Sequence, residues 1–329
     1  TMDPVCFVRR VPGLNPLHPS LFTLSKTGLH PAIAPLVMRW IPGGSSSDIE
    51  DRRGSSGGGG FGIGGAPIGC GGAIILLVLS LLFHKNFFAL LGSGDNGTQV
   101  AGPATQSRPV QQTPEEAKEV QFVSFVLDDV QKTWESIVPQ QANASYRHAT
   151  LVLFRDSTQS ACGSAQEASG PFYCPEDEKV YIDLAFYDEL KQRFGASGDF
   201  AQAYVLAHEI GHHVQKVIGI EGKVHQAMEN DPRRAKQYSV RLELQADCFA
   251  GIWAHSTQQR NILEAGDVEE GLNAAAAVGD DRLQRMAGRR VNPDSFTHGS
   301  SQQRSEWFKR GFDAGQISDC DTFASGAVR

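Results

Sequence analysis

The pattern of hydrophobic and polar positions changes along the chain, and it is weakest at the N-terminal end. Residues 1–65 show no sustained helical or alternating period, because proline interrupts VPGLNPLHPS and LHPAIAPLV, and glycine and serine dominate the stretch that follows. A segment with so few apolar side chains to bury is expected to be disordered. Met38 is the first residue of the polar part and a candidate for the natural initiating methionine. Residues 1–37 would then be an upstream extension of the predicted gene.

An uncharged run, APIGCGGAIILLVLSLLF, follows at residues 66–83. As a helix it would be roughly 27 Å long, close to the thickness of a bilayer core. We expect a transmembrane helix over residues 66–91 and a flexible polar linker over 92–113. A buried core helix is the alternative, and a signal peptide fits less well because about 65 residues precede the run.

The distribution of Lys and Arg predicts the orientation of this span. Arg39, Arg52 and Arg53 precede it, whereas the linker carries Arg108 alone. The positive-inside rule then places the N-terminus in the cytoplasm and the C-terminal domain outside it, as in a single-pass membrane protein.

A globular domain is expected over residues 114–329. Thr113, Pro114 and Glu116 predict a helix start, and VQFVSFVLDDVQKTWESIV continues with helical periodicity. ATLVLFRD (149–156) and KVYIDLAFY (179–187) are typical of strands, and nearly everything after YDELKQRFG favours helix, ending with SEWFKRGFDAG. The expected class is therefore α+β, mostly helical with a small sheet.

Charge and cysteine content argue against several classes of function. A net charge of −7 and a pI near 5.8 argue against a nucleic-acid partner. No two cysteines have CxxC spacing, which argues against a cysteine zinc site or a thioredoxin-type motif. Four cysteines lie in the C-terminal domain, an even number that suits two disulfides in an oxidising compartment: Cys162, Cys174, Cys248 and Cys320.

The stretch LAHEIGHHVQ contains the candidate metal ligands and the candidate general base. His208 and His212 are spaced i and i+4, so on a helix both imidazoles reach one ion, and Glu209 beside them can act as a general base. The motif HExxH is specific but not decisive by itself. His213 points elsewhere and is expected either to be structural or to support a ligand from behind. His225 and His255 carry no spacing signal and are expected to be surface or packing residues.

A second helix supplies a third candidate ligand. In RLELQADCFAGIWA, Glu243 and Asp247 are one turn apart on an otherwise apolar helix. Glu243 completes a His-His-Glu set, and Asp247 can bind the outer nitrogen of a ligand imidazole. The alternative is a solvated helix face, which the apolar neighbours disfavour, since two buried carboxylates are costly unless paired or liganding.

These motifs resemble a known family. HEIGHH followed by ELQADCFAG is similar to zincin metallopeptidases of the gluzincin type. From Met38 to about Phe323 the chain resembles the bacterial putative neutral zinc metallopeptidase family. The further segments that support this resemblance are MRW, DRRG, the glycine-rich stretch, the single apolar span, ACGSAQEASGPFYCPEDEKVYIDLAFYDEL and SFTHGSSQQRSEWFKRGF.

The resemblance implies a membrane-anchored peptidase with a zincin-like fold and one Zn²⁺ per chain, at the bacterial inner membrane facing the periplasm, or at the cell surface. It assigns His208, His212 and Glu243 as zinc ligands, Glu209 as catalytic base and Asp247 as a support for the ligands. It gives His298 a role in holding the oxyanion, with loop packing or helix capping as the alternative. Separately, we expect Arg304 to orient either that loop or Asp247.

The same resemblance suggests cysteine partners and a substrate strand. Cys162 is expected to pair with Cys174, and Cys248 with Cys320, the alternative being four reduced buried thiols. KVYIDLAF is the candidate edge strand for pairing with a peptide, or else an ordinary core strand.

The sequence thus favours a zinc metallopeptidase that acts on peptides or proteins, with no nucleic-acid partner. Two alternatives stay open. One is a zinc-stabilised binding or scaffold domain at the membrane, which the presence of Glu209 disfavours, and the other is a metal-dependent hydrolase of non-peptide substrates.

Overall fold

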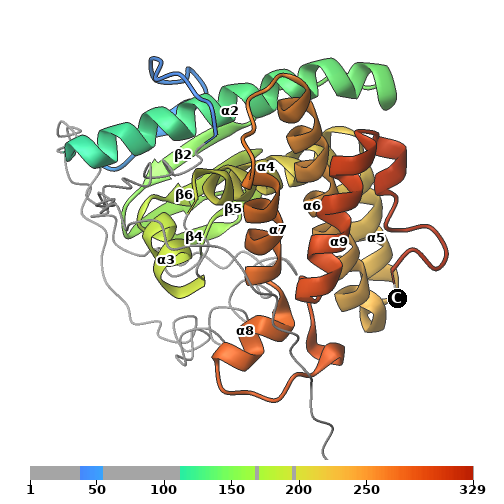
Figure 1. Ribbon diagram of the computed structural model, residues 1–329. Helices are drawn as coiled ribbons and strands as arrows, with labels where there is room; N and C mark the ends of the chain where they lie inside the picture. The colour runs from blue at the N-terminus through green and yellow to red at the C-terminus, as the bar shows by residue number, and fades with distance from the viewer. Residues whose placement is uncertain (1–37, 55–111, 167–169, 195–197, 329) are drawn as a thin grey trace, which may run out of the picture. The chain divides into compact units, whose positions relative to one another are not determined.

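The computed structural model describes residues 38–54, 112–166, 170–194 and 198–328 (Figure 1). The mostly helical α+β class is confirmed, with two small sheets beside the helices. The strands are β1 (Ile49–Asp51), β2 (Thr150–Phe154), β3 (Ser157–Ser160), β4 (Gly163–Gln166), β5 (Phe172–Cys174) and β6 (Lys179–Asp183).

Helices make up most of the rest of the described chain. They are α2 (Pro114–Gln141), α3 (Ala185–Phe194), α4 (Asp199–Val217), α5 (Ile220–Asn230), α6 (Ala235–Gln259), α7 (Asp267–Ala277), α8 (Asp280–Met286) and α9 (Ser301–Ala314). The described residues also form three short 3₁₀ turns, two between helices and one after α9: Pro232–Arg234, Pro293–Ser295 and Ile317–Cys320.

Helix α2 begins where the sequence predicts it. The hydroxyl of Thr113 accepts a hydrogen bond from the backbone N–H of Glu116 at 3.1 Å, and Pro114 occupies the first helical position, where its missing N–H costs nothing. The last helix, α9, also ends as expected, at Gly315, which adopts a φ of +64°.

The larger sheet has the strand order β1-β2-β6-β5. Strands β1, β2 and β6 run parallel, and β5 pairs antiparallel with β6. Of the two alternatives for KVYIDLAF, the core strand is confirmed and the sheet edge is wrong, because β6 has a partner on each side. The strand is also shorter than expected, since the carboxylate of Asp183 accepts the N–H of Ala185 at 3.0 Å and α3 begins there.

The expectation of disorder over residues 1–65 is wrong for residues 38–54, which are folded against the C-terminal domain. Met38 is 2% exposed, and the ring of Trp40 meets that of Phe122 edge-on with centroids 5.4 Å apart. In Figure 1 this blue segment runs beside α2. Composition predicted disorder because these anchoring residues are few and scattered among glycine and serine. The folded unit therefore includes this segment as well as the expected domain from residue 114 onward.

Helix α4 is mostly buried and contacts α2, α5, α6 and α7. Helices α6 and α9 also lie in close contact, and glycine makes this possible. A Cβ on Gly251 would lie 2.1 Å from the carbonyl oxygen of Phe308, and one on Gly311 would lie 1.8 Å from that of Cys248. Any side chain at either position would force the two helices apart.

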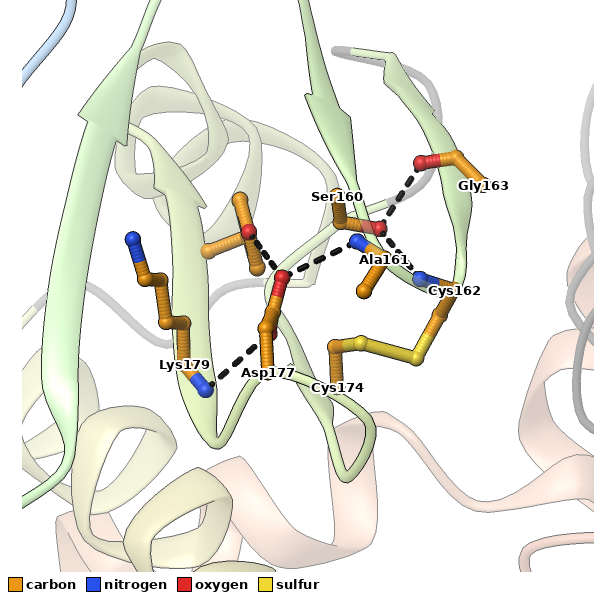
Figure 2. The surroundings of a disulfide bond; sticks show 8 residues. Ser160, Ala161, Cys162, Gly163, Cys174, Asp177 and Lys179 are labelled. Atoms are coloured by element: carbon orange, nitrogen blue, oxygen red, sulfur yellow. Dashed lines mark hydrogen bonds between the residues drawn. A yellow bond between two sulfur atoms is a disulfide. The ribbon is translucent and has the colours of Figure 1, made fainter.

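The described residues contain two disulfides, which join the pairs that the resemblance suggests. Cys162–Cys174 ties the β3–β4 hairpin to the end of β5 (Figure 2), where Asp177 accepts the N–H of Ala161 at 2.9 Å and that of Lys179 at 3.2 Å. Cys248–Cys320 ties α6 to the C-terminal 3₁₀ turn across 72 residues, a separation for which loop entropy predicts about 4 kcal/mol of stabilisation.

The expected membrane helix, residues 66–91, lies outside the described residues, as does the linker up to residue 111. Among the helices that the structure describes, none combines the length and the apolar character needed to cross a bilayer.

The packing of residues 38–54 yields a first prediction. The side chain of Arg53 is 2% exposed and pairs with Asp51 at 2.6 Å and Glu116 at 3.0 Å. Arg53→Ala removes the buried cation that pairs with both carboxylates and leaves Glu116 only its pair with Arg155, so we expect the free energy of unfolding to fall by about 3 kcal/mol. Chemical denaturation of the full chain measures this change.

The matched control is Arg233→Ala. The side chain of Arg233 is 94% exposed, so this variant should change the free energy of unfolding by less than about 0.5 kcal/mol. Equal effects from the two variants would mean that the segment does not contribute to the fold.

Candidate metal centre

Helices α4 and α6 bring the two sequence motifs together. The close approach depends on Gly211, inside the HExxH motif, because a Cβ there would lie 3.0 Å from the carbonyl oxygen of Ala246. Helix α4 presents His208 and His212 on one face, one turn apart, and α6 presents Glu243 opposite them. Glycine at the crossing thus sets the distance between the histidines and the carboxylate.

Three side chains offer ligand atoms at the spacing that a metal requires. Nε2 of His208 lies 3.3 Å from one carboxylate oxygen of Glu243, and Nε2 of His212 lies 3.7 Å from the other. All three ligand atoms lie within 4.8 Å of one another. Tetrahedral zinc with bonds near 2.1 Å places neighbouring ligands about 3.4 Å apart. The donor set and its spacing therefore fit zinc.

The outer nitrogens of both histidines have partners, which leaves each Nε2 directed at the centre. Nδ1 of His208 lies 2.9 Å from Asp247, and Nδ1 of His212 lies 3.0 Å from the side-chain oxygen of Gln215. Gln215 is held in turn, since its amide donates to the carbonyl of Leu242 at 2.8 Å. Contacts of this kind fix the tautomer and the ring orientation of a ligand histidine.

Asp247 is the most heavily bonded of these residues and is 0% exposed. The guanidinium of Arg304, on α9, donates to both of its carboxylate oxygens, each at 2.8 Å, and the hydroxyl of Tyr204, on α4, also donates to it. Of the two roles that the sequence leaves open for Arg304, the geometry therefore favours contact with Asp247. The side chain of Arg304 is itself buried and 4% exposed.

Charges inside this cluster shift one another's pKa values. Burial alone would lower the pKa of His208, but the negative charges of Asp247 and Glu243 raise it to about 9. Burial would raise the pKa of Glu243, yet the neighbouring histidines hold it well below its usual range. The pKa of Asp247 is likewise lowered by Arg304 and His208 against the effect of burial. The surroundings thus favour positive charge between the histidines and Glu243, which suits a metal cation.

Glu209 lies on α4 between the two candidate ligands and is buried, with 8% exposure. It directly follows His208 in the sequence, so the helix places this carboxylate beside the first candidate ligand.

His298 lies in the loop before α9 and is close enough to Glu243 that each affects the other's pKa. Asp280, at the start of α8, holds this loop. One of its carboxylate oxygens accepts the backbone N–H groups of Thr297, His298 and Gly299, at 2.7, 2.7 and 3.0 Å. The loop is thus anchored with the His298 side chain near the centre.

His213, His225 and His255 lie in surface or packing positions, as the sequence predicts. His213 is fully buried, with its ring nitrogens 3.0 Å from the hydroxyl of Tyr173 and 2.7 Å from the carbonyl of Arg147, so its role is structural. His225 pairs with Glu221 on its own helix, and His255 packs between α6 and α9 with Nδ1 2.7 Å from the carbonyl of Phe312.

Sequence reasoning missed three supporting residues. Tyr204 and Gln215 do carry a signal, because they stand four residues before His208 and three after His212, on the same helical face. Asp280 carries none, since it reaches the loop from 17 or more residues away along the chain.

Comparisons with known proteins agree with this geometry. Residues 38–323 match the family described as putative neutral zinc metallopeptidase. The chain is 48% identical over 290 residues to the uncharacterized protein YpfJ of Escherichia coli strain K12, covering 87% of this chain and 99% of that protein. It is 40% identical over 209 residues to the uncharacterized protein Mb2605 of Mycobacterium bovis, covering 60% of this chain and 68% of that protein. No solved structure matches. This chain therefore belongs to the putative neutral zinc metallopeptidase family.

Proposed function

We propose that this protein is a zinc-dependent metallopeptidase that hydrolyses peptide bonds in peptide or protein substrates. One observation carries the proposal: two imidazole Nε2 atoms and a carboxylate converge from separate helices, with Glu209 beside them. Membership of the family supports the same reading.

His208, His212 and Glu243 would hold one zinc ion per chain. Zinc bound there supplies the Lewis acid that polarises the scissile carbonyl and makes a water molecule more acidic. Asp247 and Gln215 keep the two imidazoles in the orientation that directs Nε2 toward the ion. Because Arg304 and Tyr204 bond Asp247, they position His208 indirectly.

Glu209 would act as the general base. Its carboxylate accepts a proton from the attacking water and returns it to the nitrogen of the leaving amine. His298 would donate a hydrogen bond to the oxyanion that develops on the substrate carbonyl. The anchoring of its loop by Asp280 supports this role, because an oxyanion donor must be fixed before the reaction.

The substrate is proposed to lie along β5. Pairing with an extended peptide requires an edge strand, and β5 is an edge of the described four-stranded sheet. It also contacts α4, which carries the histidines.

The place of action is proposed to be outside the cytoplasm and attached to a membrane. Two disulfides in the domain support an oxidising compartment. The apolar run at 66–83 supports attachment to a bilayer.

The general base gives the decisive test. Glu209→Gln preserves size but cannot accept the proton, so we expect peptide hydrolysis to be lost while one zinc per chain and the folded state are retained. Metal analysis and cleavage of a peptide library by the full chain measure both. Glu306→Gln, an exposed change on α9, is the matched control and should retain activity. Zinc binding without hydrolysis in the wild type would favour the scaffold alternative, and activity that survives Glu209→Gln would exclude this residue as the base.

The contact between Asp247 and His208 gives a second test. Asp247→Asn removes the charge that orients His208, and we expect zinc affinity to fall about 10- to 100-fold. Competition with a zinc-binding dye measures the affinity, and thermal unfolding of the zinc-free protein separates any loss of stability. Asp313→Asn, on the exposed face of α9, serves as control. Unchanged zinc affinity in Asp247→Asn would contradict the supporting role.

His298 can be tested separately from the ligands. If it holds the oxyanion, His298→Ala should lower kcat by about 10² to 10³ and leave zinc affinity unchanged. Steady-state kinetics with a cleaved peptide, together with zinc titration, distinguish this from loop packing. An unchanged kcat would leave His298 with only a structural role.

A further inference from the structure

The segment that precedes the apolar run is part of the same folded unit as the domain that follows it. Strand β1 pairs in parallel with β2, with Ile49 beside Leu151 and Asp51 beside Leu153. The backbone N–H of Leu151 donates to the carbonyl of Asp48 at 2.8 Å, and that of Arg52 donates to Leu153 at 2.7 Å. These are sheet hydrogen bonds, which require direct contact between residues on either side of the undescribed segment 55–111.

Side chains extend this contact beyond the strand. Trp40 packs on Phe122 and Phe125 of α2, and the backbone N–H of Arg39 donates to the carbonyl of Ile262, beyond the end of α6, at 2.8 Å. Asp48 accepts from the amide of Gln131 at 2.8 Å. Residues 38–54 therefore meet the domain at α2, at β2 and beyond α6, so the contact is distributed along the segment.

The three arginines that suggested a cytoplasmic N-terminus are all engaged in this packing. Arg39 pairs with Glu264, and Arg53 pairs with Asp51 and Glu116. Arg52 pairs with Glu50 at 2.8 Å and donates to the carbonyl of Gln159 at 2.8 Å. The positive-inside rule applies to Lys and Arg in short loops beside a span, whereas whole domains cross the membrane largely regardless of their charge. Arginines paired within a folded domain do not report orientation in that way.

We propose that residues 38–54 lie on the same side of the membrane as the peptidase domain. A bilayer core is about 30 Å thick, and no sheet hydrogen bond can form across it. The chain between Gly54 and Gln112 must then begin and end on one side, which excludes a single crossing with the flanks on opposite sides. Attachment to the membrane stays compatible with an even number of crossings or with insertion into one leaflet. The disulfides of the domain indicate that this shared side is the oxidising one. The inference does not depend on peptidase activity.

Cysteine labelling of the full chain tests the proposal. Cys6→Ser and Cys70→Ser remove the two cysteines that lie outside the described residues, and the chain is expressed in bacteria. Ile41→Cys, at a position 81% exposed, probes the N-terminal flank, and Arg233→Cys, with a 94% exposed side chain, probes the domain. Gly44→Cys is a second N-terminal probe, since a Cβ there meets no atom within 4 Å. A membrane-impermeant maleimide is applied to intact spheroplasts and, separately, after permeabilisation with detergent.

We expect the probes at 41, 44 and 233 to show the same ratio of labelling in intact to permeabilised cells. A cytoplasmic protein with an exposed thiol confirms that the spheroplasts are sealed. Recovery of the whole chain in the soluble fraction would satisfy the proposal too, because no bilayer would then separate the segments. Labelling of position 233 in intact cells with protection of both 41 and 44, or the reverse, would overturn it.

Discussion

The buried carboxylate of Asp247 is the interaction on which the centre depends. It belongs to α6, yet it binds an imidazole and a phenol on α4 and a guanidinium on α9, so three helices are joined at one fully buried group. An isolated charge at such a depth would be strongly unfavourable, whereas a carboxylate with this set of donors is satisfied. Because Glu243 is one turn away, the same contacts that hold the helices also hold the candidate ligands.

Close packing of the surrounding helices restricts movement of the side chains around Asp247. Backbones meet at Gly211 between α4 and α6, and at Gly251 and Gly311 between α6 and α9, so small shifts of one helix are opposed by direct contact with the next. Cys248, next to Asp247, is bonded to Cys320, and the carbonyl of Cys320 accepts the amide of Gln245. Rigid support of this kind is what a metal centre needs, since ligand positions must be held to a fraction of an ångström.

The sequence predicted the parts of the centre that are local. The i, i+4 spacing of His208 and His212 fixes their geometry as soon as the segment is helical, and carboxylates on an apolar helix single out Glu243 and Asp247. Contacts between segments that are distant in the sequence could not be predicted in this way. Asp280 supports the His298 loop through backbone N–H groups, which have no sequence signature. Strand β1 is three residues long, too short for a periodic pattern, and its stability comes from β2, about a hundred residues later. Composition alone therefore suggested disorder for a segment that tertiary contacts order.

The position of β1 also bears on how the protein can be divided. Strand β2 is flanked by β1 and β6, and four of its five residues are buried. A fragment that starts at residue 112 or later would keep the candidate metal centre but expose the backbone groups of β2 along one edge. An open, apolar strand edge is a template for pairing with other chains. Such a fragment would tend to aggregate through β2, so the N-terminal segment protects the sheet from self-association as well as adding to its stability.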